Sequence, residues 1–159
     1  MKSVYQIIFL ILGIVTAGCL WAYHFPEKST LKIQTQTGTV EYTVELALTA
    51  TEQRQGLMNR QNLPGQHGML FLFRPSSVAH MWMKNTLIPL DMIFFDEKGI
   101  VTSVHYNATP LDTTIISSGQ KVAGVLEINA TEAEKYGIQK DSVIDLQSLT
   151  IGKEHVFEK

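Results

Sequence analysis

The centre of the chain reads Trp82-Met83-Lys84-Asn85-Thr86-Leu87-Ile88-Pro89-Leu90-Asp91. A lysine, an asparagine and an aspartate stand inside a run whose other residues are typical of a buried strand. Charged side chains are seldom moved from water into apolar surroundings without a partner, because their desolvation is unfavourable. This stretch therefore predicts either an ion pair that holds the fold together or one wall of a site.

Short segments with period-two alternation surround the central stretch and predict strands. The alternating run from Leu31 to Leu48 is interrupted at Gly38, which predicts a hairpin, and Asp96-Glu97-Lys98-Gly99 predicts a second hairpin turn. Pro75-Ser76-Ser77 predicts a turn between two further strands.

Two segments favour short helices. Residues 49–59 predict a helix that begins after Thr49 or Thr51, with Leu57 and Met58 facing inward. Residues 131–136 predict one or two helical turns that end at Gly137. The expected fold is therefore α+β and mostly β: a compact antiparallel sheet or partly closed barrel with one or two short helices.

The N-terminal residues 1–23 differ from the rest of the chain. From Val4 to Tyr23 the sequence is almost wholly apolar, which is typical of a signal peptide or an N-terminal membrane anchor. Small residues precede Cys19 as in a bacterial lipobox, so lipidation at Cys19 is one reading; an uncleaved anchor and an ordinary cleaved signal are the others. All three predict an extracytoplasmic protein of the bacterial cell envelope, periplasmic or attached to the membrane as its partner.

The remaining chain predicts a polar linker at residues 24–30 and one β-rich domain at residues 31–159. The formal net charge of −2 argues against nucleic acid as a partner, because phosphate binding needs a basic face. Cys19 is the only cysteine, so no disulfide is expected in the domain, and no motif indicates a cofactor.

Three charged residues in strand-like apolar settings are the candidates for a shared polar cluster: Lys84, Asp91 and Glu127. The simplest arrangement pairs Lys84 with Asp91 or with Glu127. A helix packed over the sheet would add a guanidinium group, which suits a carboxylate or a phosphate. The predicted site contains Arg54, Arg60, Trp82, Lys84, Asn85, Asp91 and Glu127.

This cluster leaves several functions open. The first hypothesis is a binding module for a small polar ligand or an envelope partner. The second is a hydrolase-like enzyme with Asp91 or Glu127 as general base, and the third is a purely structural cluster in an interaction domain. A minor alternative is copper bound through His80, Met81 and Met83, since imidazole and thioether suit the monovalent ion.

Four sequence blocks carry a family resemblance: Arg54-Gln55-Gly56-Leu57-Met58-Asn59-Arg60, Gly68-Met69-Leu70-Phe71-Leu72-Phe73, the central stretch Trp82 to Asp91, and Val125-Leu126-Glu127. In this order they resemble the signature blocks of the domain of unknown function 192 (DUF192) family. The resemblance extends from about Leu31 to the C-terminus. It implies a compact, β-rich, barrel-like α+β domain, often exported or anchored, with no established reaction, cofactor or substrate.

Overall fold

The computed structural model describes residues 28–149. Within them the chain forms seven strands, two short helices and one 3-10 turn: β1 (Lys28–Thr35), β2 (Gly38–Ala47), α2 (Ala50–Gln55), β3 (His67–Met81), β4 (Leu90–Phe95), β5 (Val101–Ala108), β6 (Ile116–Asn129), α3 (Glu132–Lys135), β7 (Val143–Asp145) and η1 (Leu146–Ser148). The predicted mostly-β fold with short helices is confirmed.

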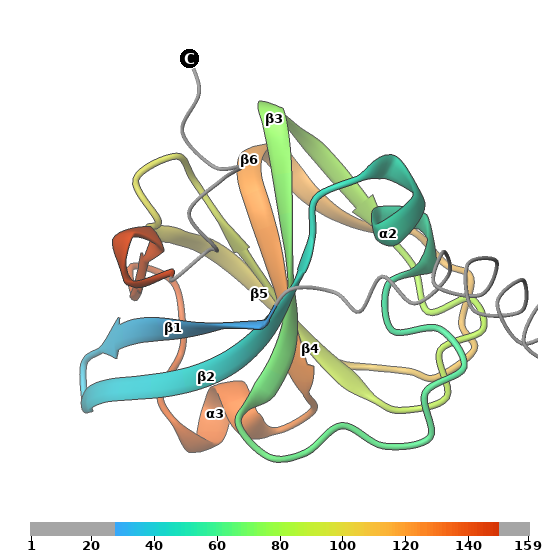
Figure 1. Ribbon diagram of the computed structural model, residues 1–159, viewed down its shortest axis with the longest axis horizontal. Coiled ribbons are helices and arrows are strands. Elements are labelled where there is room, and N and C mark those ends of the chain that lie inside the picture. The colour runs from blue at the N-terminus through green and yellow to red at the C-terminus, as the bar shows by residue number, and fades with distance from the viewer. Residues whose placement is uncertain (1–27, 150–159) are drawn as a thin grey trace, which may run out of the picture.

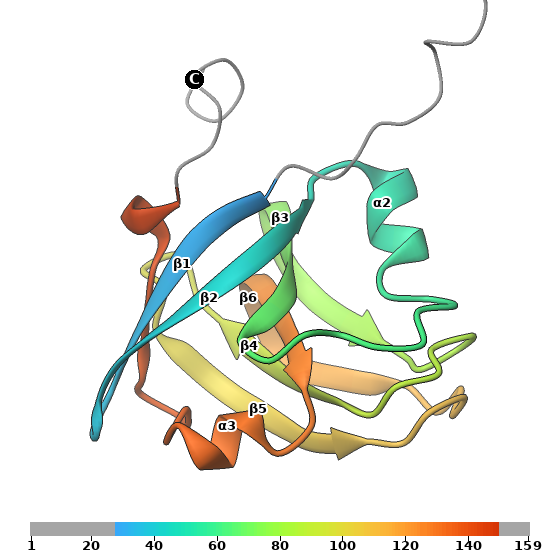
Figure 2. The ribbon, with the colours of Figure 1, turned by 60° about the horizontal axis from the view of Figure 1, so that its bottom comes forward.

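The strands form a single sheet that curls into a half-barrel (Figures 1 and 2). Its order is β5-β4-β6-β3-β2-β1-β7, and every neighbouring pair is antiparallel except β2 and β3. The two edges approach each other at a bridge between Ile100 and Val143. There the Ile144 amide donates to the Gly99 carbonyl at 2.8 Å, so the curl brings the ends of the sheet into contact.

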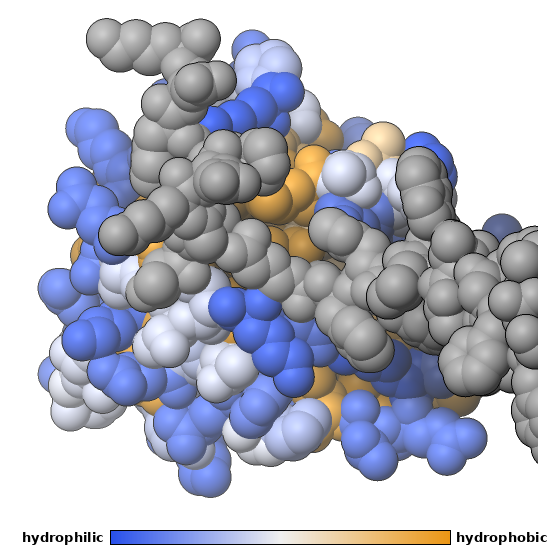
Figure 3. Space-filling view, viewed as in Figure 1, coloured by the Kyte–Doolittle hydropathy of each residue, from blue (hydrophilic) through white to orange (hydrophobic). Residues whose placement is uncertain are grey.

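The sheet is apolar on both faces over part of its area, which divides the core in two. All seven strands contribute to the first cluster, which includes Tyr42, Ile93 and Phe95 and fills the inside of the curl. The second cluster, which includes Met69 and Met92, lies on the opposite face of β3, β4 and β6, together with residues of the connecting loops. Figure 3 shows mostly hydrophilic side chains over β1, β2 and α3, and hydrophobic surface above them in the view, towards β3 and β6.

Both predicted hairpins are confirmed. Thr35 lies opposite Gly38 where β1 turns into β2. Between β4 and β5, the Asp96 carboxylate accepts hydrogen bonds from the amides of Lys98 and Ile100, each at 2.9 Å. The carboxylate thus satisfies the backbone donors of the turn, which explains why this short polar sequence reverses the chain.

Three expectations need correction. β1 begins at Lys28, so the last three residues of the predicted linker 24–30 are strand. Pro75-Ser76-Ser77 does not separate two strands but lies within β3, whose pairing with β6 jumps from Leu72 to Ser77. The helix α2 ends at Gln55 and buries none of its own residues; the buried Leu57 follows it.

The predicted N-terminal signal or anchor, the Cys19 lipidation site and residues 150–159 of the predicted domain lie outside the described residues. Among residues 28–149, no helix has the length and hydropathy required to cross a bilayer.

Candidate functional site

The site centres on Glu127, an acidic residue inside an apolar row of the sheet. On β6, Glu127 lies opposite Met69 of β3 on one side and opposite Met92 of β4 on the other. Residues directly opposite each other project from the same face, so the carboxyl group stands between two buried methionines on the face of the second cluster. Only 4% of Glu127 is exposed.

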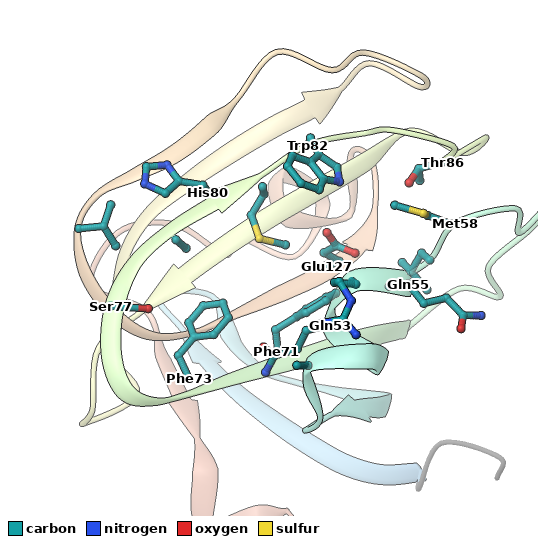
Figure 4. A pocket seen from close by; sticks show the side chains of 17 residues that line it. Gln53, Gln55, Met58, Phe71, Phe73, Ser77, His80, Trp82, Thr86 and Glu127 are labelled. Atoms are coloured by element: carbon teal, nitrogen blue, oxygen red, sulfur yellow. The ribbon is translucent and has the colours of Figure 1, made fainter.

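The carboxyl group borders a pocket of about 340 Å³, here called the Glu127 pocket. β3 curves around it, and α2 with the residues after it closes the opposite side (Figure 4). Figure 4 places Glu127 between Trp82 on one side and Phe71 and Gln53 on the other. The labelled residues that line the pocket are Gln53, Gln55, Met58, Phe71, Phe73, Ser77, His80, Trp82, Thr86 and Glu127.

The capping of α2 fixes one wall of the pocket. Thr49 accepts a hydrogen bond from the Glu52 amide, and the Glu52 carboxylate accepts one from the Thr49 amide at 2.8 Å, which is a complete capping box. Gln53 then ties the helix to the sheet, because its side-chain amide donates to the carbonyls of Ala47 and Leu72 at 3.1 and 2.9 Å.

The chain turns sharply after α2 at Gly56, which has a φ of 48°. A side chain at this position would meet strain from the backbone conformation, and its Cβ would lie 3.3 Å from the Phe71 ring. Leu57 is buried in the second cluster immediately afterwards. The glycine therefore allows the chain to pass close over Phe71 and to close the pocket from this side.

The remaining wall is formed by loops that are tied together by backbone hydrogen bonds. The Asn59 amide donates to the Asn85 carbonyl at 2.8 Å, and the Leu111 amide donates to the Thr86 carbonyl at 3.1 Å. The Met83 amide donates to the Asp112 carbonyl at 2.8 Å. The central stretch of the sequence is thus held from two sides, which places Trp82 and Thr86 at the pocket.

Glu127 has no protein partner within the described part of the chain: no hydrogen bond or ion pair reaches its side chain from residues 28–149. Burial alone raises the pKa of this carboxyl group from its ordinary value of 4.5 to about 8. The acid is therefore mainly protonated at neutral pH. It is then able both to donate and to accept a hydrogen bond inside the pocket.

Asp91 does not share this site, and the predicted cluster of Asp91 with Glu127 is wrong. Asp91 lies opposite Ile128, so it projects from the face opposite to that of Glu127. It is fully buried, and its two carboxylate oxygens accept hydrogen bonds from the amides of Asn107 and Ala133, each at 2.9 Å. Asp91 therefore fastens the start of α3 and the end of β5 to β4.

The predicted pairing of Lys84 with Asp91 or Glu127 is also wrong. Lys84 and Asn85 are exposed at a turn, and no ion pair of Lys84 occurs in the part of the chain that the structure describes. The sequence predicts extended strand in this segment, whereas Asn85 has a left-handed φ of 56°. Both side chains are exposed, and the Asn85 side-chain amide donates to the Met58 sulfur at 3.9 Å, so neither joins Asp91 or Glu127 in a polar cluster.

The two arginines have different positions. Arg60 forms a bidentate ion pair with Glu45 of β2, with 2.7 Å between Nη1 and Oε1. This pair connects the loop after α2 to the sheet. The Glu45 carboxylate raises the pKa of Arg60 through this hydrogen bond. Arg54 lines the Glu127 pocket, but it is exposed and its guanidinium donates to the Thr51 hydroxyl at 3.0 Å.

Of the seven predicted site residues, the structure brings Arg54, Trp82 and Glu127 together at one pocket. The sequence reading did not select Gln53, Phe71, Phe73 or Thr86 as site residues. Phe71 and Phe73 carry a usable signal, since alternate residues of a strand face one side, and Met69 of the same strand lies opposite Glu127. Gln53 offers no such signal, because its position depends on hydrogen bonds to the carbonyls of Ala47 and Leu72, and Leu72 lies on a different strand.

The three residues of the copper alternative do not lie at one site. His80 and Met81 line the Glu127 pocket, whereas Met83 is buried in the second cluster. Among residues 28–149, no group of three or more histidine, cysteine, aspartate or glutamate side chains is arranged to hold a metal ion.

A second pocket and two buried atoms without hydrogen bonds each lack one property of the Glu127 pocket. A larger pocket of about 560 Å³ lies beside β7, but its ionisable side chains, Arg74, Glu97, Lys98 and Asp145, are not buried. The Tyr42 hydroxyl and one oxygen of Glu132 have no hydrogen-bond partner in the described chain, but both atoms are shut off from solvent. Burial, and then the nearby Glu132, raise the pKa of Tyr42. Of these features of residues 28–149, only the Glu127 pocket combines a buried acid with an opening.

The chain is similar to two solved structures. A crystal structure from Sinorhizobium meliloti 1021, described as a "putative transcription regulator", is 38% identical, with a TM-score of 0.76, and the match covers 78% of this chain and 97% of that one. A crystal structure of a protein of unknown function from Novosphingobium aromaticivorans is 36% identical, with a TM-score of 0.73, and covers 74% of this chain and 84% of that one.

The comparison with curated proteins found no match. The comparison with protein families matched residues 32–146 to DUF192, whose description reads "Uncharacterized ACR". This range includes all four sequence blocks that carry the resemblance and nearly all of the folded domain. The chain belongs to the DUF192 family.

Proposed function

We propose that this domain is a binding module that holds a small polar ligand in the Glu127 pocket. The observation that carries the proposal is the position of Glu127: a carboxyl group that is 4% exposed, borders the pocket and has no partner from residues 28–149. A ligand that hydrogen-bonds this acid would supply the partner that residues 28–149 do not provide.

The walls of the pocket support the same function. Ligand sites in proteins are mostly apolar concavities with a few polar groups that fix the orientation of the ligand, and a volume of about 340 Å³ falls within their usual range. Phe71, Phe73 and Trp82 supply the apolar surface. A titratable group whose pKa is shifted by burial in a pocket is itself a common mark of a functional site.

Methyl NMR of methionine offers a direct test, because Met58 and Met81 line the pocket whereas Met69 and Met92 lie in the core. The full chain, labelled at its methionine methyl groups and held in lipid nanodiscs, would be screened against a library of small polar fragments. The proposal predicts that some fragments shift the methyl signals of Met58 and Met81 more than that of Met92. These fragments should bind the Glu127→Gln variant with a different affinity. A library that leaves both pocket methyl groups unmoved would contradict it.

A hydrolase-like enzyme is the second candidate, and the raised pKa of Glu127, about 8, is the observation that favours it. A carboxyl group that stays protonated at neutral pH is suited to donate a proton as a general acid. Asp91 is not available for this role, since both of its oxygens accept backbone amides away from the pocket. Glu127→Gln would abolish turnover and keep binding if the enzyme reading holds, whereas a pure binding module shows no turnover with either protein.

We also propose that the N-terminal segment attaches the domain to the membrane on the extracytoplasmic side of the bacterial envelope. The support is the apolar run from Val4 to Tyr23 and the small residues before Cys19. Intact-mass measurement of the protein from its membrane fraction separates the three forms. A diacylglyceryl mass on a chain that begins at Cys19 identifies a lipoprotein, the full-length mass an uncleaved anchor, and a shorter unmodified chain a cleaved signal.

A further inference from the structure

The side chains around Glu127 indicate the chemical class of the ligand, an inference that rests on the proposed function of the pocket. The ionisable side chains that line the pocket beside Glu127 are Arg54 of α2 and His80 of β3. Both are exposed, and Arg54 already donates to Thr51 at 3.0 Å. The interior of the pocket therefore contains one acid and no basic side chain beside it.

We propose that the Glu127 pocket binds an organic ammonium ion, with the cationic head against the Glu127 carboxyl group and the hydrocarbon part along the aromatic walls.

Three features of the pocket support a cation over an anion or a neutral group. An ammonium group brings two or three N–H donors and a positive charge, which supply what both oxygens of Glu127 lack. Phe71, Phe73 and Trp82 line the pocket, and aromatic rings attract cations to their faces. An anionic ligand would find only the exposed Arg54 and His80 near the mouth, and it would face the carboxyl group at depth.

The binding reaction has a defined proton balance. Glu127 is protonated in the free pocket near neutral pH, because burial raises the pKa of its carboxyl group to about 8. The bound ammonium ion favours the ionised form, so the proton of Glu127 leaves to solvent as the ion pair forms. At pH 7 the release should approach about one proton per bound ligand, and affinity should rise about tenfold per pH unit up to about pH 8. Arg54 and His80 are the other ionisable groups that line the pocket, and neither contributes to the shift at Glu127.

A matched set of three probes tests the charge preference: 3-phenylpropylamine, 3-phenylpropan-1-ol and 3-phenylpropanoate share one skeleton. Their dissociation constants for the full chain in phosphatidylcholine nanodiscs would be read from the Met58 and Met81 methyl shifts, with empty nanodiscs as the blank. Calorimetry at pH 7 in phosphate and in Tris would give the proton release. The expected result is an amine that binds at least tenfold more tightly than the alcohol and releases a proton.

Two variants connect the result to Glu127. Glu127→Gln keeps the shape of the acid and removes its charge, so the amine should lose its advantage while the alcohol still binds. Glu41→Gln, at an exposed acid of β2 that pairs with Lys32, is the matched control and should leave all three constants unchanged. The methyl spectrum of each variant shows whether it is folded.

The outcomes separate the two proposals. Tighter binding of the alcohol or the acid than of the amine, or an amine advantage that survives in Glu127→Gln, would overturn the ammonium inference and leave the binding function standing. If none of the three probes and no member of the fragment library shifts the pocket methyl groups, both the inference and the proposed function fail.

Discussion

Asp91 and Glu127 lie on adjacent strands, one register position apart, and project from opposite faces of the sheet. Asp91 is opposite Ile128, and Glu127 is opposite Met92. Asp91 has a backbone amide on each of its oxygens, whereas Glu127 has no partner in the described chain. Two acids that look equivalent in the sequence therefore differ in the structure: Asp91 joins parts of the fold, and Glu127 borders a pocket without a partner from residues 28–149.

The stability of the protein should fall with rising pH in a way that Glu127→Gln removes. The pKa of Glu127 is about 8 in the folded chain and near its ordinary 4.5 when unfolded, so the folded state binds the extra proton between these values. The stabilising contribution of the protonated Glu127 is fully present below pH 4.5 and is lost as pH rises to 8. The free energy of unfolding should fall by about 1 kcal/mol per pH unit in this range. Urea unfolding of both proteins from pH 5 to 9 measures it. A stability difference that does not change with pH would refute this.

Asp91→Asn should destabilise the fold by about 3 kcal/mol, because the substituted amide loses the charge and places N–H donors against a backbone amide. Lys84→Met is the matched control from the same central stretch. Lys84 is exposed and has no ion pair in the described chain, so the free energy of unfolding should change by less than about 0.5 kcal/mol. If urea unfolding shows that the two variants lose equal free energy of unfolding, the result would support the predicted Lys84–Asp91 pair.

The Arg60–Glu45 pair should contribute more than the surface pair of the β1–β2 hairpin. The side chains of Arg60 and Glu45 are 32% and 15% exposed, against 48% and 59% for Lys32 and Glu41. Double-mutant cycles to glutamine should give a coupling energy of about 1 kcal/mol for the first pair and under about 0.5 kcal/mol for the second. The reverse order would show that Arg60 does not hold the loop after α2 to the sheet.

Gly124→Ala should destabilise the protein by more than about 2 kcal/mol, since the sheet has no room for a methyl group there. A Cβ at Gly124 would lie 2.3 Å from the Phe71 carbonyl oxygen and 2.4 Å from the Phe95 ring. Gly65→Ala is the control, because its nearest contact would be an ordinary 3.7 Å to Glu132. Thermal unfolding of the two variants checks this, and a stable Gly124→Ala protein would mean that β3 and β6 can separate locally.

Local patterns were sufficient to predict much of the fold. The Gly38 and Asp96–Gly99 turns and the capping residue Thr49 act through neighbours in the sequence, so their effect can be read there. The bend inside β3 could not be read in this way, because it depends on a register shift in the pairing with β6 between Leu72 and Ser77. Pairing between distant strands decides whether such a segment separates two strands or bends one.

The site was predicted only in part for the same reason. Glu127 stood out because an acid in an apolar run is unusual, and its burial follows from that context. Its separation from Asp91 depends on the register of β4 against β6, and a shift of one residue would exchange the faces. The turn at Asn85, which carries Lys84 into solvent, depends on loop contacts such as that with Asn59. Neither feature can be predicted from the central stretch Trp82 to Asp91 alone.

Glu127 borders an open pocket and has no partner from residues 28–149, which is the basis of the proposed ligand site. Its side-chain carboxyl carbon, followed by ¹³C NMR against pH in the full chain with and without 3-phenylpropylamine, tests this most directly. We expect a midpoint near pH 8 in the free protein and a lower midpoint with the amine bound. A midpoint near 4.5 that the amine leaves unchanged would show a carboxyl group already hydrogen-bonded to water or protein, and would refute the proposed ligand site at Glu127.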